Sequence, residues 1–95
     1  MILPMKVRAH VFFDGRVQGV SFRYFTRDIA RSQHVTGWVR NLHDGRVEAV
    51  FEGERSDVEQ TIIRCQNENP FARVTDADVA WEDRLEGLPD FRITY

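Results

Sequence analysis

The stretch VTGWVRNLHDGRVEAVFEG, residues 35–53, carries the pattern of a β-hairpin. On each side of Asp44-Gly45, apolar residues alternate with polar ones, which is the period of a half-buried strand. Asp-Gly is a strong signal for a tight turn between two antiparallel strands. We therefore expect a strand over Val35–Arg40, a turn at Asn41–Gly45, and a second strand that starts at Val47 and stops at Gly53.

The sequence before the hairpin predicts a strand followed by a helix. From Lys6 to Phe13 every second residue is apolar, so these residues are expected to form a strand with one buried face. Asp14-Gly15 breaks the pattern, and a loop continues to Ser21. Ser21 is a favourable N-cap, and apolar residues then recur at helical spacing until about Gln33.

The sequence after the hairpin predicts a helix followed by two strands. Ser56–Glu59 has the form of a capping box, so we expect a second helix to begin there and to end by Asn69-Pro70. Alternation over Asp76–Glu82 predicts a fourth strand. A loop with glycine and proline follows, and Phe91–Tyr95 predicts a short final strand.

The expected order of elements is therefore β-α-β-β-α-β with a short extra C-terminal strand. Each helix has a single apolar stripe to bury, so both helices must cover one face of an antiparallel sheet. This is the ferredoxin-like α+β sandwich, and we expect the 95 residues to form one domain, 1–95. Many unrelated functions share this fold, so the function must be inferred from a site.

Composition argues against several classes of function. With 13 basic and 15 acidic residues the net charge is −2, which disfavours nucleic-acid binding through counterion release. Cys65 is the only cysteine, so an intramolecular disulfide and a zinc cluster built from thiolates are excluded. No apolar run approaches the ~20 residues of a membrane span, and Met1–Lys6 is too short for a secretory signal. We therefore expect a cytoplasmic protein that binds neither membranes nor nucleic acid.

The loop GRVQGVSFR, Gly15–Arg23, combines the features of an anion-binding site. Its two glycines permit positive φ, which lets successive backbone N–H groups point at one centre. The helix that follows adds free N–H groups and a partial positive charge, and Arg23 adds a guanidinium suited to phosphate oxygens. Such a site suits one phosphoryl group, and the glycine patterns of nucleotide-binding loops are absent. The same residues fit a tight strand-to-helix turn with a solvated Arg23 equally well.

Two segments of the sequence resemble the signatures of the acylphosphatase family. Gly15–Arg23 is similar to the first signature, G-x-V-Q-G-V-x-[FM]-R. Gly37–Asn41 is similar to the second, together with the residues that follow it, Gly45, Val47 and Gly53. The resemblance covers the whole chain, including the ending Phe91-x-Ile93-x-Tyr95. It implies a hydrolase that converts acyl phosphates to a carboxylate and inorganic phosphate, with no metal and no cofactor.

The resemblance also implies roles for individual residues. Arg23 would bind the phosphate, and Asn41 would hold the attacking water through its side-chain amide. The phosphate-binding loop would comprise Gly15, Arg16, Val17, Gln18, Gly19 and Val20. Inorganic phosphate, the product, would act as a competitive inhibitor, and we expect the protein to be a monomer.

The chemistry of the substrate agrees with these roles. A departing carboxylate has a low pKa and needs little general-acid help, so positioning and charge stabilisation suffice. Asn41 is neutral and orients water without acting as a strong base. We therefore hypothesise that a phosphate oxygen of the substrate takes the water proton. Without the family pattern around it, Asn41 would fit an ordinary turn residue at a strand end.

Two other functions are compatible with parts of the sequence. A binding module would hold the anion without turnover, as in the acylphosphatase-like N-terminal part of larger carbamoyl-transferring hydrogenase maturation proteins. The chain ends soon after its last strand and has no cysteine-rich extension, so we expect a free-standing enzyme. An RNA-binding domain of this fold would need paired aromatics on its third strand, where Arg46–Glu52 offers one aromatic residue and two acids.

We interpret the remaining conspicuous side chains as structural. The three histidines match no metal-ligand spacing and are expected at the surface, and the acidic residues of the fourth strand are expected on a solvated face. Cys65 is expected on the buried stripe of the second helix, and the two tryptophans are expected to pack on strands. The other residues concerned are His10, His34, His43, Trp38, Trp81, Asp76, Asp78, Glu82 and Asp83.

Overall fold

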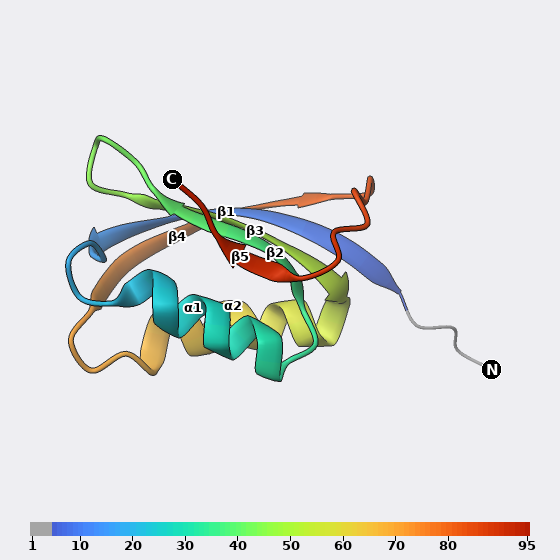
Figure 1. The fold of residues 1–95 in the computed structure, drawn as a ribbon, viewed down its shortest axis with the longest axis horizontal. Helices are drawn as coiled ribbons and strands as arrows, with labels where there is room; N and C mark the ends of the chain where they lie inside the picture. Colours follow the sequence, from blue (N-terminus) through green and yellow to red (C-terminus); the bar gives the residue numbers. More distant parts are fainter. Residues whose placement is uncertain (1–4) are drawn as a thin grey trace.

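The computed structural model describes residues 5–95 of the chain (Figure 1). The elements follow in the order β1 (Lys6–Arg16), α1 (Phe22–Ser32), β2 (Thr36–Asn41), β3 (Val47–Glu54), α2 (Arg55–Asn67), β4 (Arg73–Glu82) and β5 (Phe91–Ile93). The segment Met1–Lys6, which we interpreted as too short for a secretory signal, lies mostly outside the described residues.

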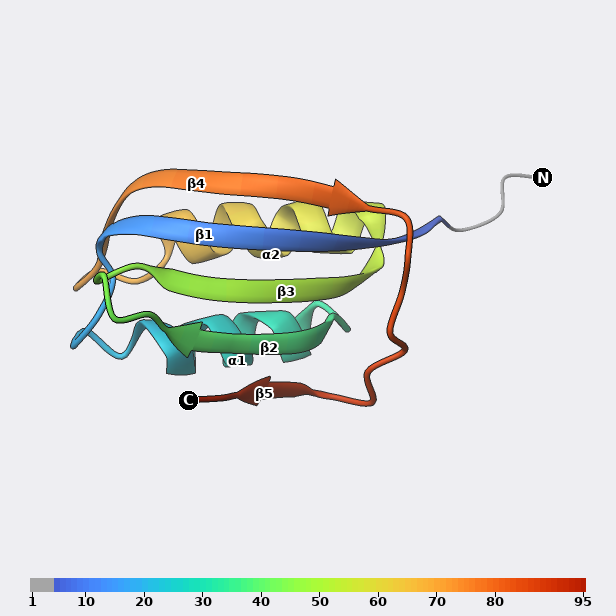
Figure 2. The same cartoon turned by 90° about the horizontal axis from the view of Figure 1, so that it is seen from above.

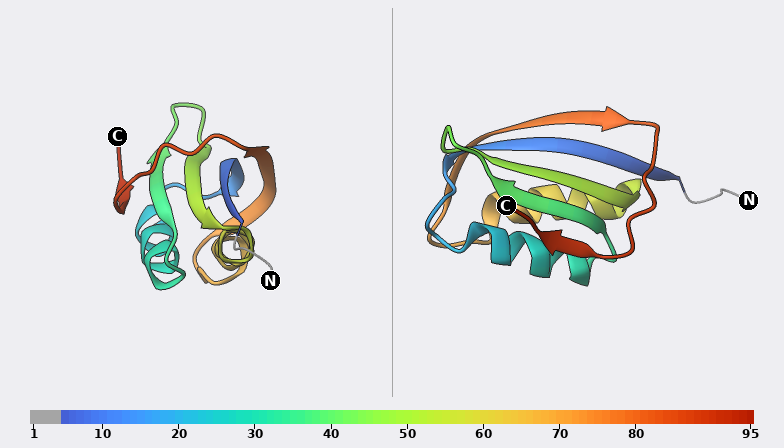
Figure 3. Two further views of the ribbon diagram at one scale, coloured as in Figure 1. Left: turned by 90° about the vertical axis from the view of Figure 1, so that its right-hand side faces the viewer. Right: turned by 45° about the horizontal axis from the view of Figure 1, so that its top comes forward.

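The strands form one sheet in the order β4-β1-β3-β2-β5, and both helices lie against the same face of it (Figures 2 and 3). This confirms the ferredoxin-like α+β arrangement. The sheet is nevertheless mixed, because β5 pairs with β2 in parallel while the other strand pairs are antiparallel. The connection 83–90 crosses the end of the sheet from β4 to the start of β2, so β5 must run in the same direction as β2 (Figure 2).

The core lies between the sheet and the two helices. Alternate residues of β1 from Val7 to Phe13 are buried, as the sequence pattern predicts. Two aromatic contacts close the core, with ring centroids 5.2 Å apart for Phe13 and Phe22 and 5.5 Å apart for Phe51 and Phe91. Burial of this apolar surface is the main stabilising contribution to a domain of this size. Helix residues that complete the core are Ile29, Ala30, Val58, Ile62 and Cys65.

Both predicted helix N-caps are wrong in their chemistry. Ser21 precedes α1 as predicted, but it has φ 58° and its side chain makes no capping hydrogen bond. The predicted capping box at Ser56–Glu59 is wrong, because α2 begins at Arg55 with Glu54 as its N-cap. β3 continues into α2 without a loop, and the Arg55 N–H donates to the Met5 carbonyl at 2.9 Å. Ser56 therefore lies inside the first turn of the helix, where it cannot cap it.

Four strands extend further at one end than their patterns predict. β3 ends at Glu54 instead of Gly53, and β4 begins at Arg73 instead of Asp76. β1 continues past Phe13 to Arg16 because β4 pairs with it on both sides of an irregularity between Asp14 and Gly15. β2 includes Asn41, which pairs with Val47 of β3 instead of opening the turn. A neighbouring strand supplies the hydrogen bonds in each case, and single-strand periodicity carries no information about that neighbour.

The sheet face away from the helices carries ion pairs between β1, β2 and β3. Glu48 is 7% exposed and accepts from Arg40 at 2.7 Å, and its other oxygen lies 2.6 Å from His10 Nε2. Burial alone would raise the pKa of the Glu48 carboxyl, but its hydrogen bonds to His10 and Arg40 hold that pKa below its usual value. The expectation of a plain surface histidine is therefore incomplete for His10, whereas His34 and His43 are exposed as predicted.

Candidate active site

The ends of β1 and β2 meet the start of α1 at one end of the sheet. Both strands are antiparallel to β3 and therefore run in the same direction, so their C-terminal ends lie on the same side of the molecule (Figure 2). A pocket of about 240 Å³ lies at this place. It is lined by Val17, Gly19, Ser21, Phe22, Arg23, Tyr24 and Asn41.

The N-terminus of α1 forms one wall of this pocket. The first turn of α1 contains no acidic residue, so the partial positive charge of the helix end is not neutralised there. Gly19 has φ 72°, and no atom lies within 4 Å of the place where a Cβ would be. The backbone at Gly19 is therefore open to a ligand, which is the arrangement that an anion-binding loop requires.

Arg23 brings a positive charge to the same pocket. Within residues 5–95 its guanidinium forms no ion pair, since no carboxylate oxygen lies within 4.0 Å of it. Its Cζ lies 5.2 Å from the centroid of the Tyr95 ring, which restricts the side chain without neutralising it. The charge of Arg23 is thus available to a bound anion.

Asn41 brings a polar group to the other side of the pocket. It is the last residue of β2 and points to the face that the helices cover, as Val39 does two residues earlier. Its Oδ1 is buried and has no hydrogen-bond partner among the described residues. Because an unpaired buried acceptor costs free energy, this oxygen is suited to hold a donor from a bound molecule.

Four of the eight residues that the sequence predicts for the site line the pocket together: Val17, Gly19, Arg23 and Asn41. Gly15 and Arg16 instead belong to β1. At Gly15, φ is 116° and a Cβ would lie 2.1 Å from the carbonyl oxygen of Arg73, so the close approach of β4 accounts for this glycine.

Gln18 and Val20 hold the loop in place from its two sides. Gln18 is not among the residues that line the pocket, and its Nε2 donates to the carbonyl oxygens of Leu42 at 2.7 Å and Arg46 at 2.9 Å. Val20 is 9% exposed, and its carbonyl oxygen accepts from Asn69 Nδ2 at 3.0 Å. The prediction that backbone N–H groups of Gly15–Val20 bind the phosphate stays a prediction, and the side-chain bonds of Gln18 leave its backbone N–H free for that role.

Three side chains at this site are not predicted by the sequence patterns. Tyr24 lines the pocket, Tyr95 stacks on Arg23, and Asn69 anchors the loop. Tyr24 follows Arg23 directly and could have been found as part of the first helical turn. Neither Tyr95 nor Asn69 shows a local signal, because each reaches the site only through the packing of β5 or of the α2–β4 connection.

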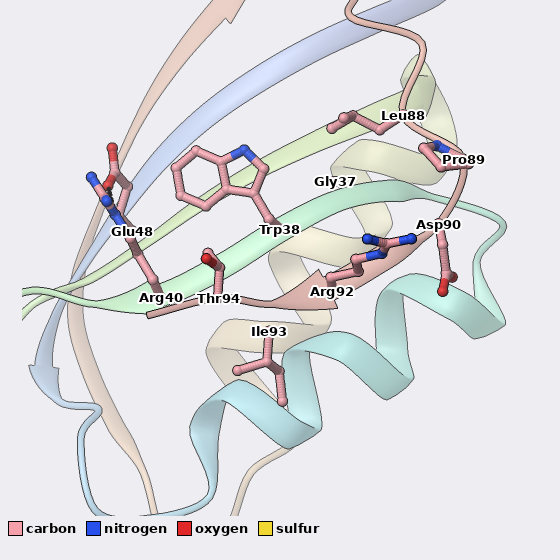
Figure 4. A pocket seen from close by; sticks show the side chains of 10 residues that line it. All are labelled: Gly37, Trp38, Arg40, Glu48, Leu88, Pro89, Asp90, Arg92, Ile93 and Thr94. Atoms are coloured by element: carbon pink, nitrogen blue, oxygen red, sulfur yellow. Dashed lines mark hydrogen bonds and ion pairs between the residues drawn. The ribbon is translucent and has the colours of Figure 1, made fainter.

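A second hollow of about 640 Å³ lies over β2 and β5 on the opposite face of the sheet (Figure 4). Figure 4 shows Trp38, Arg92 and Thr94 pointing to the same side of these strands. Most of its charges are already paired within the fold, since Arg40 binds Glu48 and Asp90 binds Arg31. It contains none of the predicted site residues and no helix N-terminus, so the smaller pocket is the candidate active site.

Within residues 5–95, no group of three or more histidine, cysteine, aspartate or glutamate side chains is arranged to hold a metal ion. In the same part of the chain, neither helix has the length and apolar character needed to cross a membrane.

The sequence of this chain is similar to members of one protein family. The sequence model of a family described as Acylphosphatase matches residues 9–93. A protein of Natronomonas pharaonis named Acylphosphatase is 53% identical over 88 residues, which are 93% of this chain and 95% of that protein.

Solved structures extend the match to three dimensions. The crystal structure of acylphosphatase from Bacillus subtilis superposes with a TM-score of 0.91 at 40% identity, covering 94% of this chain and 99% of that one. The crystal structure of full-length HypF, in its phosphate- and nucleotide-bound form, superposes with a TM-score of 0.85 at 25% identity. The match to HypF covers 99% of this chain and only 12% of that one.

Proposed function

The chain belongs to the acylphosphatase family, and on this premise we propose that it hydrolyses acyl phosphates in the pocket between Gly19, Arg23 and Asn41. Acylphosphatases cleave the carboxyl–phosphate bond and release a carboxylate and inorganic phosphate. We infer the location of the site from one observation. Among residues 5–95, an arginine without an ion pair and an asparagine with an unpaired buried oxygen line the same pocket, beside the N-terminus of α1.

The phosphoryl group of the substrate is bound first. Its oxygens accept hydrogen bonds from backbone N–H groups around Gly19 and from the planar guanidinium of Arg23. In the loose transition state of phosphoryl transfer, charge is spread over the three equatorial oxygens, and donors fixed around these oxygens stabilise that arrangement. A pocket of about 240 Å³ suits one phosphoryl group with the acyl part directed outward past Tyr24.

Water then attacks the phosphorus atom. Asn41 Oδ1 accepts a hydrogen bond from this water and aligns it opposite the leaving group. A bond forms between the water oxygen and phosphorus, the bond from phosphorus to the acyl oxygen breaks, and the carboxylate leaves with the electron pair. A phosphate oxygen of the substrate takes the water proton, because Asn41 is neutral. No metal takes part in this scheme.

The same site accounts for two further properties that we propose, and a third, the location, is proposed from the sequence. Inorganic phosphate competes with the substrate because it occupies the same donors. The pocket is formed entirely by one chain, so a monomer is sufficient for activity. We place the enzyme in the cytoplasm.

The test is hydrolysis of benzoyl phosphate by the purified protein in the presence of a metal chelator. We expect turnover that inorganic phosphate inhibits competitively, and little activity on phosphomonoesters, whose alkoxide leaving groups are poor. Arg23→Ala should abolish activity. Asn41→Ala should lower kcat on the order of 10²-fold, by analogy with loss of one oriented polar group. A normal kcat in Asn41→Ala would remove this residue from the mechanism, and comparable activity on phosphomonoesters would contradict the leaving-group argument.

A further inference from the structure

We propose that Gln18 is a positioning residue that sets the distance between the bound phosphoryl group and Asn41. The inference rests on the proposed function, because it assigns Gln18 a task within that site. Gln18 Nε2 donates to the carbonyl oxygen of Leu42 at 2.7 Å and to that of Arg46 at 2.9 Å. Leu42 follows Asn41 directly in the chain, so the amide of Gln18 is bonded to the Leu42–His43 peptide unit, one residue beyond Asn41.

The phosphate-binding loop and Asn41 have no direct backbone connection. β1 and β2 are not neighbours in the sheet, because β3 lies between them. Within residues 5–95, no backbone–backbone hydrogen bond joins the 17–21 loop to the 41–46 hairpin. The two hydrogen bonds of Gln18 are the only side-chain bonds that cross this gap in the same part of the chain. Within the described residues, the amide of Gln18 is therefore the direct hydrogen-bonded link between the loop and the hairpin that carries Asn41.

The geometry of these bonds fixes orientation as well as distance. One NH₂ group uses both of its hydrogens, each on a different carbonyl at the base of the hairpin. The Arg46 carbonyl also accepts from the Leu42 N–H at 2.9 Å, so the target of Gln18 is itself a hydrogen-bonded turn. A misplacement of about 1 Å between reacting groups can cost on the order of 10²-fold in rate, so a small loop shift is sufficient to affect catalysis.

Asn69 provides the matched comparison. Its Nδ2 donates to the carbonyl oxygen of Val20 at 3.0 Å, and its Oδ1 accepts from the Phe71 N–H at 2.9 Å. Asn69 thus anchors the same loop through the same type of bond, but it attaches the loop to the α2–β4 connection, and its side chain forms no hydrogen bond to the hairpin within residues 5–95. Loss of Asn69 loosens the loop in general, whereas loss of Gln18 loosens it specifically from Asn41.

The experiment is a pair of double-mutant cycles on the full chain. Gln18→Met and Asn69→Leu each remove the amide donor without adding charge, and each is made in the wild-type background and with Asn41→Ala. The measurements are kcat on benzoyl phosphate, the inhibition constant of inorganic phosphate, and the thermal midpoint. Should Gln18→Met fail to fold, Gln18→Asn replaces it, because the amide is then retained but withdrawn by one methylene from the hairpin.

For a positioning role, Gln18→Met lowers kcat about 10- to 100-fold in the wild-type background. The phosphate inhibition constant changes little, because Arg23 and the loop N–H groups still bind the anion. In the Asn41→Ala background the same change lowers kcat by no more than about twofold, since the residue being positioned is gone. Asn69→Leu has the same effect on kcat in both backgrounds.

Two results would overturn the proposal. One is a Gln18→Met effect on kcat that is as large with Asn41→Ala as without it, which would make Gln18 a general support of the loop. The other is an unchanged kcat for a folded Gln18 variant while Asn41→Ala is impaired. If Asn41→Ala itself is fully active, the proposed role of Asn41 fails, and the task assigned to Gln18 fails with it. That outcome is separate from the first two because it needs no Gln18 variant.

Discussion

Replacing Glu52 by glutamine should destabilise the protein at neutral pH far more than its isosteric shape implies. Glu52 lies on β3 with its side chain 5% exposed. Its Oε2 accepts from Arg8 Nη1 at 2.7 Å and from the Glu86 N–H at 2.8 Å, and its Oε1 accepts from the Gly87 N–H at 3.0 Å. This carboxylate thus binds the 83–90 connection to the sheet. The same connection leads to β5.

The magnitude follows from counting donors around Glu52. Whichever way the amide introduced by Glu52→Gln is turned, its NH₂ faces at least one of the three donors that the carboxylate satisfies. The best orientation loses one charge-assisted hydrogen bond and weakens the other two, so we expect a loss of about 3 kcal/mol in the free energy of unfolding. For a domain of this size, that corresponds to a fall of roughly 15 °C in Tm.

The destabilisation caused by Glu52→Gln should depend on pH, because Glu52 titrates and glutamine does not. Burial alone would raise the pKa of Glu52, but the N–H groups of Glu86 and Gly87 and the Arg8 guanidinium hold it below its usual value. A carboxyl with a lowered folded-state pKa contributes stability that is fully present above the ordinary pKa of about 4.3 and is lost as the pH falls through the lowered value. Glutamine does not titrate. The gap in stability between wild type and Glu52→Gln should therefore be widest near neutrality and narrow as the solution is acidified.

The assay is denaturant unfolding followed by circular dichroism at pH 7 and near pH 3. Glu82→Gln is the control, because Glu82 pairs with the same Arg8 at 3.0 Å but its side chain is 45% exposed. We expect this control to cost less than about 1 kcal/mol. The reasoning is refuted if the two variants are equally stable at pH 7, or if the gap for Glu52→Gln is as wide in acid as at neutrality.

Four further outcomes are expected, two from the packing of the fold at Gly15 and Cys65 and two from the site at Gly19 and Arg23. Gly15→Ala should lower the free energy of unfolding by at least about 2 kcal/mol, because it strains the backbone and drives a Cβ to 2.1 Å from the Arg73 carbonyl. Gly19→Ala meets no atom within 4 Å and should cost only about 1 kcal/mol in the same denaturant titration, yet lower kcat because its methyl enters the pocket. Arg23→Lys should recover little of the activity lost in Arg23→Ala in the benzoyl phosphate assay, because an ammonium lacks the planar fork. Burial raises the pKa of the Cys65 thiol to about 12, so a thiol reagent at pH 8 should label the protein only after unfolding.

The elements of the fold could be predicted wherever a short-range pattern decides them. Alternation placed β1 and the β2–β3 hairpin, and the apolar stripe that contains Cys65 placed α2, because each reports one buried face. The N-caps could not be predicted in the same way. A serine at Ser56 has the correct type and spacing for a cap, but β3 runs directly into α2 and places the cap at Glu54. The continuity of the backbone overrides the side-chain preference there.

The candidate site was likewise predictable in part from the sequence. The sequence by itself determined which residues bring charge, backbone freedom and a neutral amide, because Arg23, Gly19 and Asn41 have these properties wherever they lie. Only the tertiary structure decided what each of them faces. Gln18 belongs to the loop in sequence but bonds to the hairpin, and Tyr95 reaches Arg23 only because β5 pairs with β2 in parallel. Local sequence encodes chemical type and periodicity, whereas partners across the sheet depend on how the strands are ordered.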